Sequence, residues 1–113
     1  MDTKWIYLLK METELGEEYY KIGITKKDPK DRVKQLQTGN AFDIELITQF
    51  KTEIGNLTET TLHRTYSNNH KRGEWFELDY DQVDGFLYMC ERVEANLKLM
   101  RDENSYWQDR YNK

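Results

Sequence analysis

A cluster of basic residues in an otherwise acidic chain is the first feature that suggests a functional site. The chain has 113 residues and a formal net charge of −4, yet residues 21–34 carry six basic side chains against two acidic ones. The basic residues are Lys21, Lys26, Lys27, Lys30, Arg32 and Lys34. A protein of negative net charge is a poor candidate for coating nucleic acid by bulk electrostatics. The local charge therefore favours a single site over a basic coating.

Glu59 and His63 form a second pair of interest. They are four residues apart in a predicted helix, so their side chains share one helix face. A carboxylate offers the hard oxygen that Mg²⁺ or Mn²⁺ accepts, and a histidine can exchange a proton near neutral pH. Glu59 also lies three residues after Asn56 and can act as its capping partner. The two roles exclude each other, because a carboxylate bound to the helix start is not free for a metal.

The elements that must position these residues follow from composition and spacing. Residues 4–11 (KWIYLLKM) and 19–25 (YYKIGIT) predict two strands, and the polar loop between them indicates an antiparallel hairpin. Asp28 and Pro29 predict the N-cap and first position of a helix that ends near Gly39. A third strand is expected at residues 43–52, a second helix from a cap at Asn56 to about residue 68, and a short strand at residues 72–78.

The remaining residues predict a long final helix that opens at Asp79 or Asp81. The fold class is therefore α+β: a mostly antiparallel sheet of three to four strands flanked by helices, with a domain over residues 1–80 and a helix over residues 81–113. Apolar residues recur every three or four positions from Cys90, a heptad pattern. The helix packs on its own domain or forms a homodimer, and the dimer seam would contain Val93, Leu97, Met100, Asn104 and Trp107.

Bulk features exclude several classes of protein. Cys90 is the single cysteine, so the chain has no disulfide framework and no cysteine-based zinc site, and we expect an intracellular, reducing setting. No apolar run approaches the roughly 18 residues of a membrane span, and no secretory leader opens the chain. The phosphate-binding loop GxxxxGK[ST], the zinc motif HExxH and the serine-hydrolase motif GxSxG are missing.

Several short motifs together resemble the GIY-YIG nuclease superfamily. IYLLK (6–10) and YYKIGIT (19–25) are similar to its two signature strands, DRVKQLQTGN (31–40) to its first helix, and ETTLHRTY (59–66) to its second. With GEWFEL (73–78), the combination resembles the phage-rich branch that includes T5-phage-type and meiotically up-regulated domains. Trp5 stands at the first signature glycine and Lys21 at the second signature tyrosine. The asparagine that many members carry in the last core strand has no clear counterpart.

The resemblance implies a small GIY-YIG-like domain that hydrolyses DNA phosphodiester bonds with Mg²⁺ or Mn²⁺. Glu59 would bind the metal, Arg32 and Lys21 the phosphate, and Tyr7 with His63 would handle the proton of the attacking water. DNA backbone would pass along Lys26, Lys27, Lys30 and Lys34. A phage-encoded member would act in the host-cell cytoplasm.

A different class of function also fits these residues. The domain would then be catalytically inactive and would bind nucleic acid or protein through its C-terminal helix. Taken singly, Tyr7 is a strand tyrosine, Arg32 a solvated helix residue, His63 a half-buried histidine with a satisfied ring, and the lysines are ordinary surface charges. Trp75 and Phe76 are expected in the core of the last strand.

Overall fold

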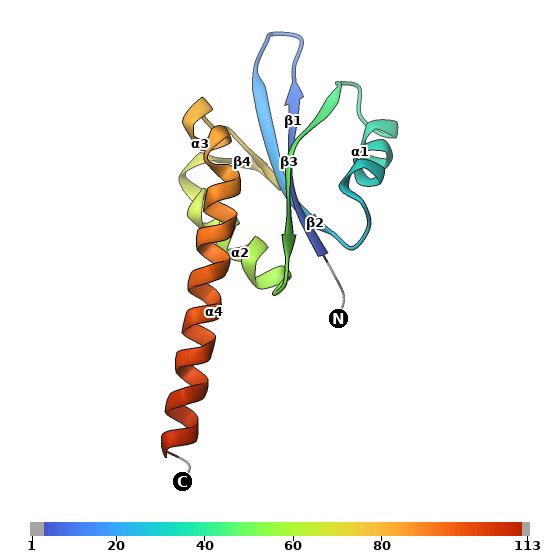
Figure 1. Ribbon diagram of the computed structural model, residues 1–113. Coiled ribbons are helices and arrows are strands. Elements are labelled where there is room, and N and C mark those ends of the chain that lie inside the picture. Colours follow the sequence, from blue (N-terminus) through green and yellow to red (C-terminus); the bar gives the residue numbers. More distant parts are fainter. Residues whose placement is uncertain (1–3, 112–113) are drawn as a thin grey trace.

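The protein is built on a five-stranded antiparallel sheet (Figure 1). The computed structural model describes the backbone of residues 4–111 and the side chains of residues 4–101. The strands are β1 (Lys4–Glu12), β2 (Glu18–Thr25), β3 (Ile44–Thr52), β4 (His70–Arg72) and β5 (Trp75–Phe76). Their order across the sheet is β3-β1-β2-β5-β4. The expected α+β class is confirmed. The sheet has one strand more than the three to four predicted: this is β4, which is joined to β5 by a turn at Gly73 (φ +58°).

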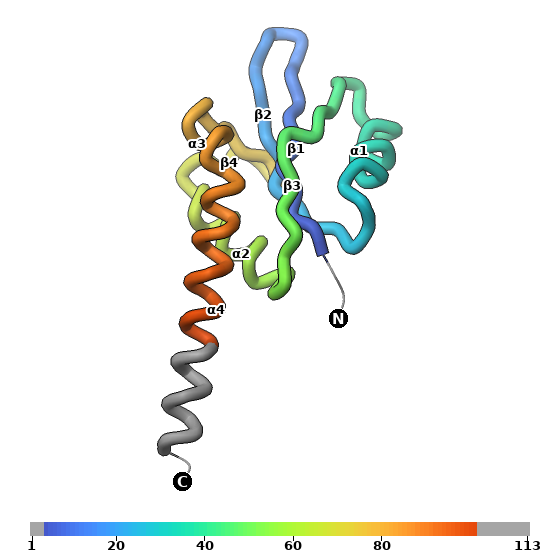
Figure 2. The backbone as a smooth tube through the Cα atoms, in the orientation of Figure 1, coloured from blue at the N-terminus to red at the C-terminus, as the bar shows by residue number. Residues whose placement is uncertain are grey.

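The helices cover both faces of this sheet. They are α1 (Pro29–Thr38), α2 (Asn56–Thr65), α3 (Tyr80–Asp84) and α4 (Phe86–Tyr111), with a 3₁₀ turn, η1 (Ser67–Asn69), after α2. Figures 1 and 2 show α1 on one side of the sheet and α2 and α4 together on the other. Within the described part of the chain, no helix combines the length and the apolar character that crossing a membrane requires.

Alternation along β1 separates the two faces. Ile6 and Leu8 are fully buried in the main core with residues of α2 and α4, whereas Tyr7 and Leu9 are buried on the opposite face, where α1 lies. The predicted β1–β2 hairpin is confirmed, with Tyr7 paired to Gly23 and Leu9 to Lys21. Lys21 and Gly23 therefore share the sheet face of Tyr7.

The predicted start of the first helix is confirmed. The side chain of Asp28 accepts a hydrogen bond from the backbone N–H of Lys30 at 3.0 Å, and Pro29 is buried at the first helical position. Helix α1 ends at Gly39, as the sequence indicated. This cap fixes where the basic segment leaves β2 and enters the helix.

Two other helix boundaries differ from the prediction. Asn56 does not cap α2, because the N-cap is Gly55, whose φ of +62° is accessible to glycine at little cost. The expected single final helix is divided in two. Asp79 caps the short helix α3, and Gly85 ends it before α4 begins, since the N–H of Gly85 bonds back to the carbonyls of Asp81 and Val83.

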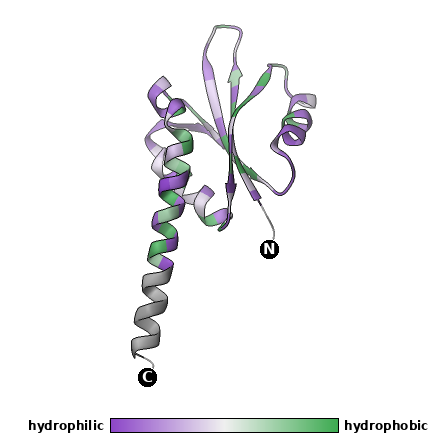
Figure 3. Ribbon diagram, viewed as in Figure 1, coloured by the Kyte–Doolittle hydropathy of each residue, from purple (hydrophilic) through white to green (hydrophobic). Residues whose placement is uncertain are grey.

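The first half of α4 belongs to the domain core. Phe86, Cys90 and Val93 are buried in the main apolar cluster, and Leu97 packs against it. Figure 3 shows apolar residues at intervals along this part of the helix. Val93 and Leu97, predicted for a dimer seam, thus contact their own domain. Met100 is 58% exposed, and the side chains of Asn104 and Trp107 lie outside the described residues.

Candidate functional site

Tyr7 lies across a glycine of the neighbouring strand. A Cβ atom placed on Gly23 would stand 2.8 Å from Cε1 of Tyr7 and closer still to its hydroxyl oxygen and Cζ. Only a residue without a side chain therefore allows the phenol ring to cross β2. Tyr7 is 2% exposed, and its hydroxyl has no hydrogen-bond partner among the described residues, although it is not sealed from solvent. The oxygen is free to bind a water molecule or a substrate group.

The second half of β2 forms an open sheet edge. Strand β5 pairs with β2 only at Tyr20 and Lys21, so the backbone groups beyond Lys21 need other partners. His63 of α2 supplies one of them, because its Nε2 lies 2.8 Å from the carbonyl oxygen of Ile22. Since a carbonyl only accepts, Nε2 carries the proton and donates it. The ring also meets Phe76 edge-on at 5.1 Å between centroids.

This hydrogen bond limits what His63 can do. In the neutral ring, Nδ1 is then the nitrogen left to accept a proton. No described hydrogen bond joins His63 to Tyr7, the residue with which a proton relay was predicted. The structure therefore places His63 beside β2, next to Ile22, and gives its Nε2 a structural role.

Glu59 lies one helical turn before His63, next to the same edge. Its carboxylate is half-buried and makes no hydrogen bond or ion pair with a described residue. Burial raises the pKa of Glu59, and the field of Glu74 raises it further, while His63, Lys21 and Lys4 act in the opposite sense. Because Gly55 is the N-cap, the capping role for Glu59 is wrong, and its carboxylate is free for another ligand.

Lys21 is a cation on the Tyr7 face of the sheet. Its Nζ forms an ion pair with Glu74 at 2.8 Å and lies 5.7 Å from the centre of the Trp75 ring. The side chain of Lys21 is largely buried, whereas that of Glu74 is half exposed. A phosphate that binds Lys21 would therefore compete with the carboxylate of Glu74. Phe76 is a core residue as predicted, whereas Trp75 is half-buried beside this cation.

Lys4 and Glu74 contribute to the site, and neither was selected from the sequence. Lys4, Lys26 and Asn56 line a hollow of about 220 Å³ together with Ile24 and Thr25. Nζ of Lys4 lies 3.5 Å from Oδ1 of Asn56, at the start of α2. Nothing in the sequence around Lys4, at the start of a strand, indicates a functional role. Lys4 reaches the hollow only because of the register of β1 against β2.

The remaining predicted residues, apart from Lys26, lie outside the hollow that Lys4 and Asn56 line. Arg32 is half-buried on α1, and its Nη1 donates to Oε1 of Gln35 at 3.2 Å. No described contact joins it to Tyr7 or Glu59. Four lysines predicted to contact DNA are exposed and form no ion pair with a described residue: Lys26, Lys27, Lys30 and Lys34. They occupy the β2–α1 connection and α1.

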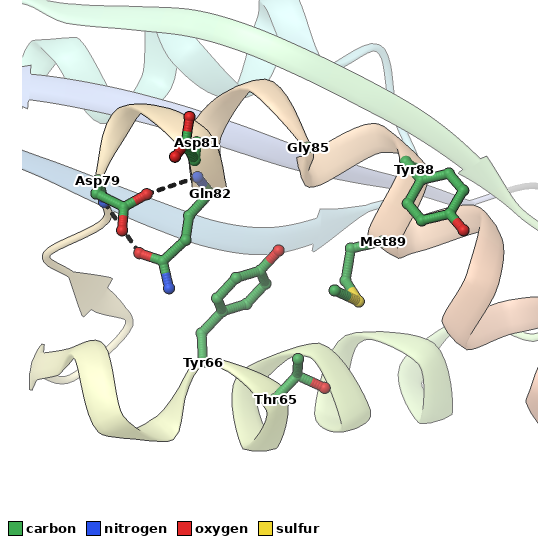
Figure 4. Close-up of a pocket in the computed structure, with 8 residues that line it drawn as sticks. All are labelled: Thr65, Tyr66, Asp79, Asp81, Gln82, Gly85, Tyr88 and Met89. Carbon is green, nitrogen blue, oxygen red and sulfur yellow. Dashed lines mark hydrogen bonds between the residues drawn. The ribbon is translucent and has the colours of Figure 1, made fainter.

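A larger hollow of about 440 Å³ lies at the other end of α2 (Figure 4). Its polar groups are mostly engaged, because Asp79 and Gln82 form the reciprocal cap of α3. Tyr66 lines it from α2, and burial raises the pKa of this tyrosine to about 12. The hollow lies seven residues along the helix from Glu59 and brings none of the predicted catalytic side chains together.

The family model that matches this chain describes a GIY-YIG-like, phage-type domain associated with endonucleases. The model of the T5orf172 domain matches residues 4–91, and the chain belongs to this family. The match confirms the resemblance drawn from the two signature strands. A search of curated proteins and a search of solved structures each return no match. The protein is thus a nuclease-like or DNA-binding module.

Proposed function

We propose that the protein is a metal-dependent endonuclease that hydrolyses DNA phosphodiester bonds at the open edge of β2. The observation that carries the proposal is the half-buried, unpartnered carboxylate of Glu59 at the edge that the Tyr7 ring crosses. Buried carboxylates are normally paired, so one without a partner at a solvent-facing edge is suited to a cation. Membership of the T5orf172 family supports the same conclusion.

The residues present fit a magnesium or manganese ion held by one protein carboxylate. Within the described residues, no cluster of three or more acidic, histidine or cysteine side chains surrounds a possible metal position. Mg²⁺ accepts such a site, because it keeps several waters and takes further oxygens from a substrate phosphate. Glu59 would hold the ion. A bound divalent ion would supply positive charge that stabilises the transition state of phosphodiester hydrolysis.

The side chains around Glu59 suit the other tasks of the reaction. Hydrolysis forms a bond from phosphorus to a water oxygen, breaks the bond to one sugar oxygen, removes a proton from the water and returns one to the leaving oxygen. The hydroxyl of Tyr7 can orient the water and take its proton while passing its own proton to Nδ1 of His63, the ring nitrogen that the bond to Ile22 leaves available. Lys21 would bind a phosphate oxygen after Glu74 is displaced.

DNA would be held along the cations that border this edge. Lys4 and Lys26 line the hollow beside the start of α2, and Lys27, Lys30 and Lys34 continue the positive surface onto α1. Arg32 lies on the same helix, and its planar guanidinium group would bind two phosphate oxygens at once. Contacts of this kind fix the position of a duplex without reading its sequence.

The test is a cleavage assay with Mg²⁺ and Mn²⁺ on supercoiled, branched and single-stranded DNA. The expected result is cleavage that requires the metal, with the loss of cleavage in a Glu59→Ala variant that remains folded. A Glu59→Ala protein that cuts as fast as the parent under the same Mg²⁺ would refute the mechanism.

A second function, association through α4, is favoured by one observation. Leu99 and Met100 are each 58% exposed on the helix beyond the domain core, which is unusual for two adjacent large apolar side chains. An inactive domain that acts through this helix would show concentration-dependent association and no cleavage. Sedimentation of the parent and of a Leu99→Ser/Met100→Ser variant distinguishes the two, and a parent that stays monomeric at all concentrations removes this function.

A further inference from the structure

A buried carboxylate of α4 joins three elements behind the candidate site. Glu94 is 5% exposed, and its side chain accepts hydrogen bonds from the hydroxyls of Thr52 and Thr58. The Thr58 contact measures 3.1 Å, and the backbone N–H of Glu53 approaches the other carboxylate oxygen at 3.4 Å. No described cation pairs with Glu94. Its charge is therefore compensated by donors from β3 and α2, which makes the arrangement specific to these partners.

These donors converge on the first turn of α2. Thr58 lies in that turn, and the hydroxyl of Thr52 also accepts from the N–H of Gly55, the N-cap of the helix at 3.0 Å. Gly55 has no side chain that could cap the first N–H groups. Glu94 thus brings, from another helix, a negative charge to this helix start and holds the side chain of Thr58 in its first turn.

Thr58 immediately precedes Glu59 on this turn. Successive residues point about 100° apart on a helix, so a turn anchored by Thr58 on the α4 side presents Glu59 toward the β2 edge. Without the anchor, an uncapped first turn frays, and a carboxylate in it loses a fixed position. A metal ligand needs that position, and outer partners of ligands commonly supply it.

We propose that Glu94 is a positioning residue that holds the first turn of α2 and thereby sets the place of Glu59. The inference rests on the proposed metal role of Glu59 and extends it to α4. Glu94 lies outside the segment matched by the family model, residues 4–91. On this proposal the site needs the part of α4 that follows residue 91, and this helix holds a metal ligand in place as well as packing on the core.

The test uses the full chain with three variants and one control. Glu94→Leu removes the acceptor and keeps an apolar filler, Thr58→Val removes one donor at constant shape, and Glu94→Gln keeps a carbonyl acceptor. Lys98→Ala is the control, because Lys98 forms an ion pair at 2.5 Å between α4 and Glu53, which follows β3, and has no described hydrogen bond or ion pair with α2. Thr58→Val keeps the test usable if Glu94→Leu does not fold.

Two measurements test the role of Glu94 without relying on DNA cleavage. Amide hydrogen exchange at Thr58 and Glu59, whose N–H groups bond to the carbonyl of Gly55 at 3.1 and 3.3 Å, reads the first turn. Paramagnetic broadening of α2 signals by added Mn²⁺ reads the metal position. We expect exchange about tenfold faster in Glu94→Leu and Thr58→Val, and a Mn²⁺ requirement raised about tenfold. Glu94→Gln should fall between them and the parent, and Lys98→Ala should change neither.

The results separate two failures. Unchanged exchange in Glu94→Leu and Thr58→Val, or faster exchange with an unchanged Mn²⁺ requirement, overturns the role of Glu94 alone. A parent protein in which Mn²⁺ broadens no signal near Glu59 overturns the proposed metal site, and with it this role.

Discussion

Helix α2 has two neighbouring faces that meet different surroundings. Thr58, Leu62 and Tyr66 follow one another at four-residue spacing and are almost completely buried against the core. Glu59 and His63, each one residue further, are half-buried beside the open edge of β2. The first face holds the domain together, and the second presents polar groups where a strand lacks a partner. A single short helix thus serves both stability and the candidate chemistry, and changes to either face should separate the two.

The largest effect is expected on the buried face. Leu62→Ala should lower the free energy of unfolding by about 2–5 kcal/mol, because it opens a cavity in the core. Leu57→Ala is the matched control on the same helix, since Leu57 is 55% exposed and little burial is lost. Chemical denaturation of both variants measures the difference, and equal losses would contradict the division of the helix into two faces.

The next effect concerns the ring that crosses the open edge. Gly23→Ala forces a Cβ into the phenol of Tyr7, so stability should fall by about 1–3 kcal/mol and Tyr7 should be displaced from the site. Gly39→Ala is the control, because a Cβ at Gly39 meets nothing within 4 Å. Denaturation and cleavage assays check the pair. A Gly23→Ala protein as stable and as active as Gly39→Ala would disprove the tight crossing of Tyr7 over β2.

The third prediction concerns the pH dependence of stability that the buried thiol of Cys90 causes. Burial raises the pKa of the Cys90 thiol from 9.0 to about 12, with Glu94 and Glu91 adding to the shift. The raised value means that the folded protein keeps the proton when the unfolded chain has lost it. Stability should therefore be complete below about pH 9 and fall as the pH rises toward 12.

Cys90→Ala removes the contribution of the thiol to this decline, on the order of 2 kcal/mol at pH 11. The measurement is the free energy of unfolding from pH 8 to pH 11 in both proteins. Parallel curves would contradict a buried, protonated thiol. Because Tyr66 is affected in the same sense, a smaller decline should persist in the variant.

The smallest effect should come from His63. His63→Ala leaves the carbonyl of Ile22 without its donor at the open edge, which should cost about 1 kcal/mol, since solvent can partly replace the bond. His70→Ala is a close control, because His70 also bonds to a carbonyl, that of Gly73, and also meets Phe76 edge-on, but is exposed. Thermal denaturation compares the two variants. An equal loss of stability would show that the position of His63 at the open edge of β2 makes its hydrogen bond no more important than that of His70.

Local sequence signals predicted much of the fold. The hairpin, the cap at Asp28 and Pro29, and the third strand are confirmed because each depends on residues close together in the chain. The start of α2 was misassigned because Asn56 is a good capping residue, whereas Gly55 is the N-cap and its N–H donates to the hydroxyl of Thr52. The break at Gly85 was missed because the apolar spacing continues across it.

The candidate site was predictable only in part. Glu59 and His63 share a helix face by spacing alone, and the structure brings that face to β2. Lys4 joins them through strand register, and Glu74 through an ion pair between the β4–β5 turn and Lys21 of β2; spacing reveals neither. The hydrogen bond from His63 to Ile22 was not predictable either, because it depends on how far β5 extends along β2.

The proposed function depends on Glu59 acting as the metal-binding carboxylate of a nuclease. The most direct measurement is the single-turnover rate of DNA cleavage with saturating Mg²⁺ for the parent, Glu59→Gln and Glu53→Gln. Glu53 is the matched control, an exposed carboxylate six residues earlier that pairs with Lys98. We expect Glu59→Gln to cleave about 10³-fold more slowly and Glu53→Gln to match the parent. Cleavage by Glu59→Gln at the parental rate would contradict the claim.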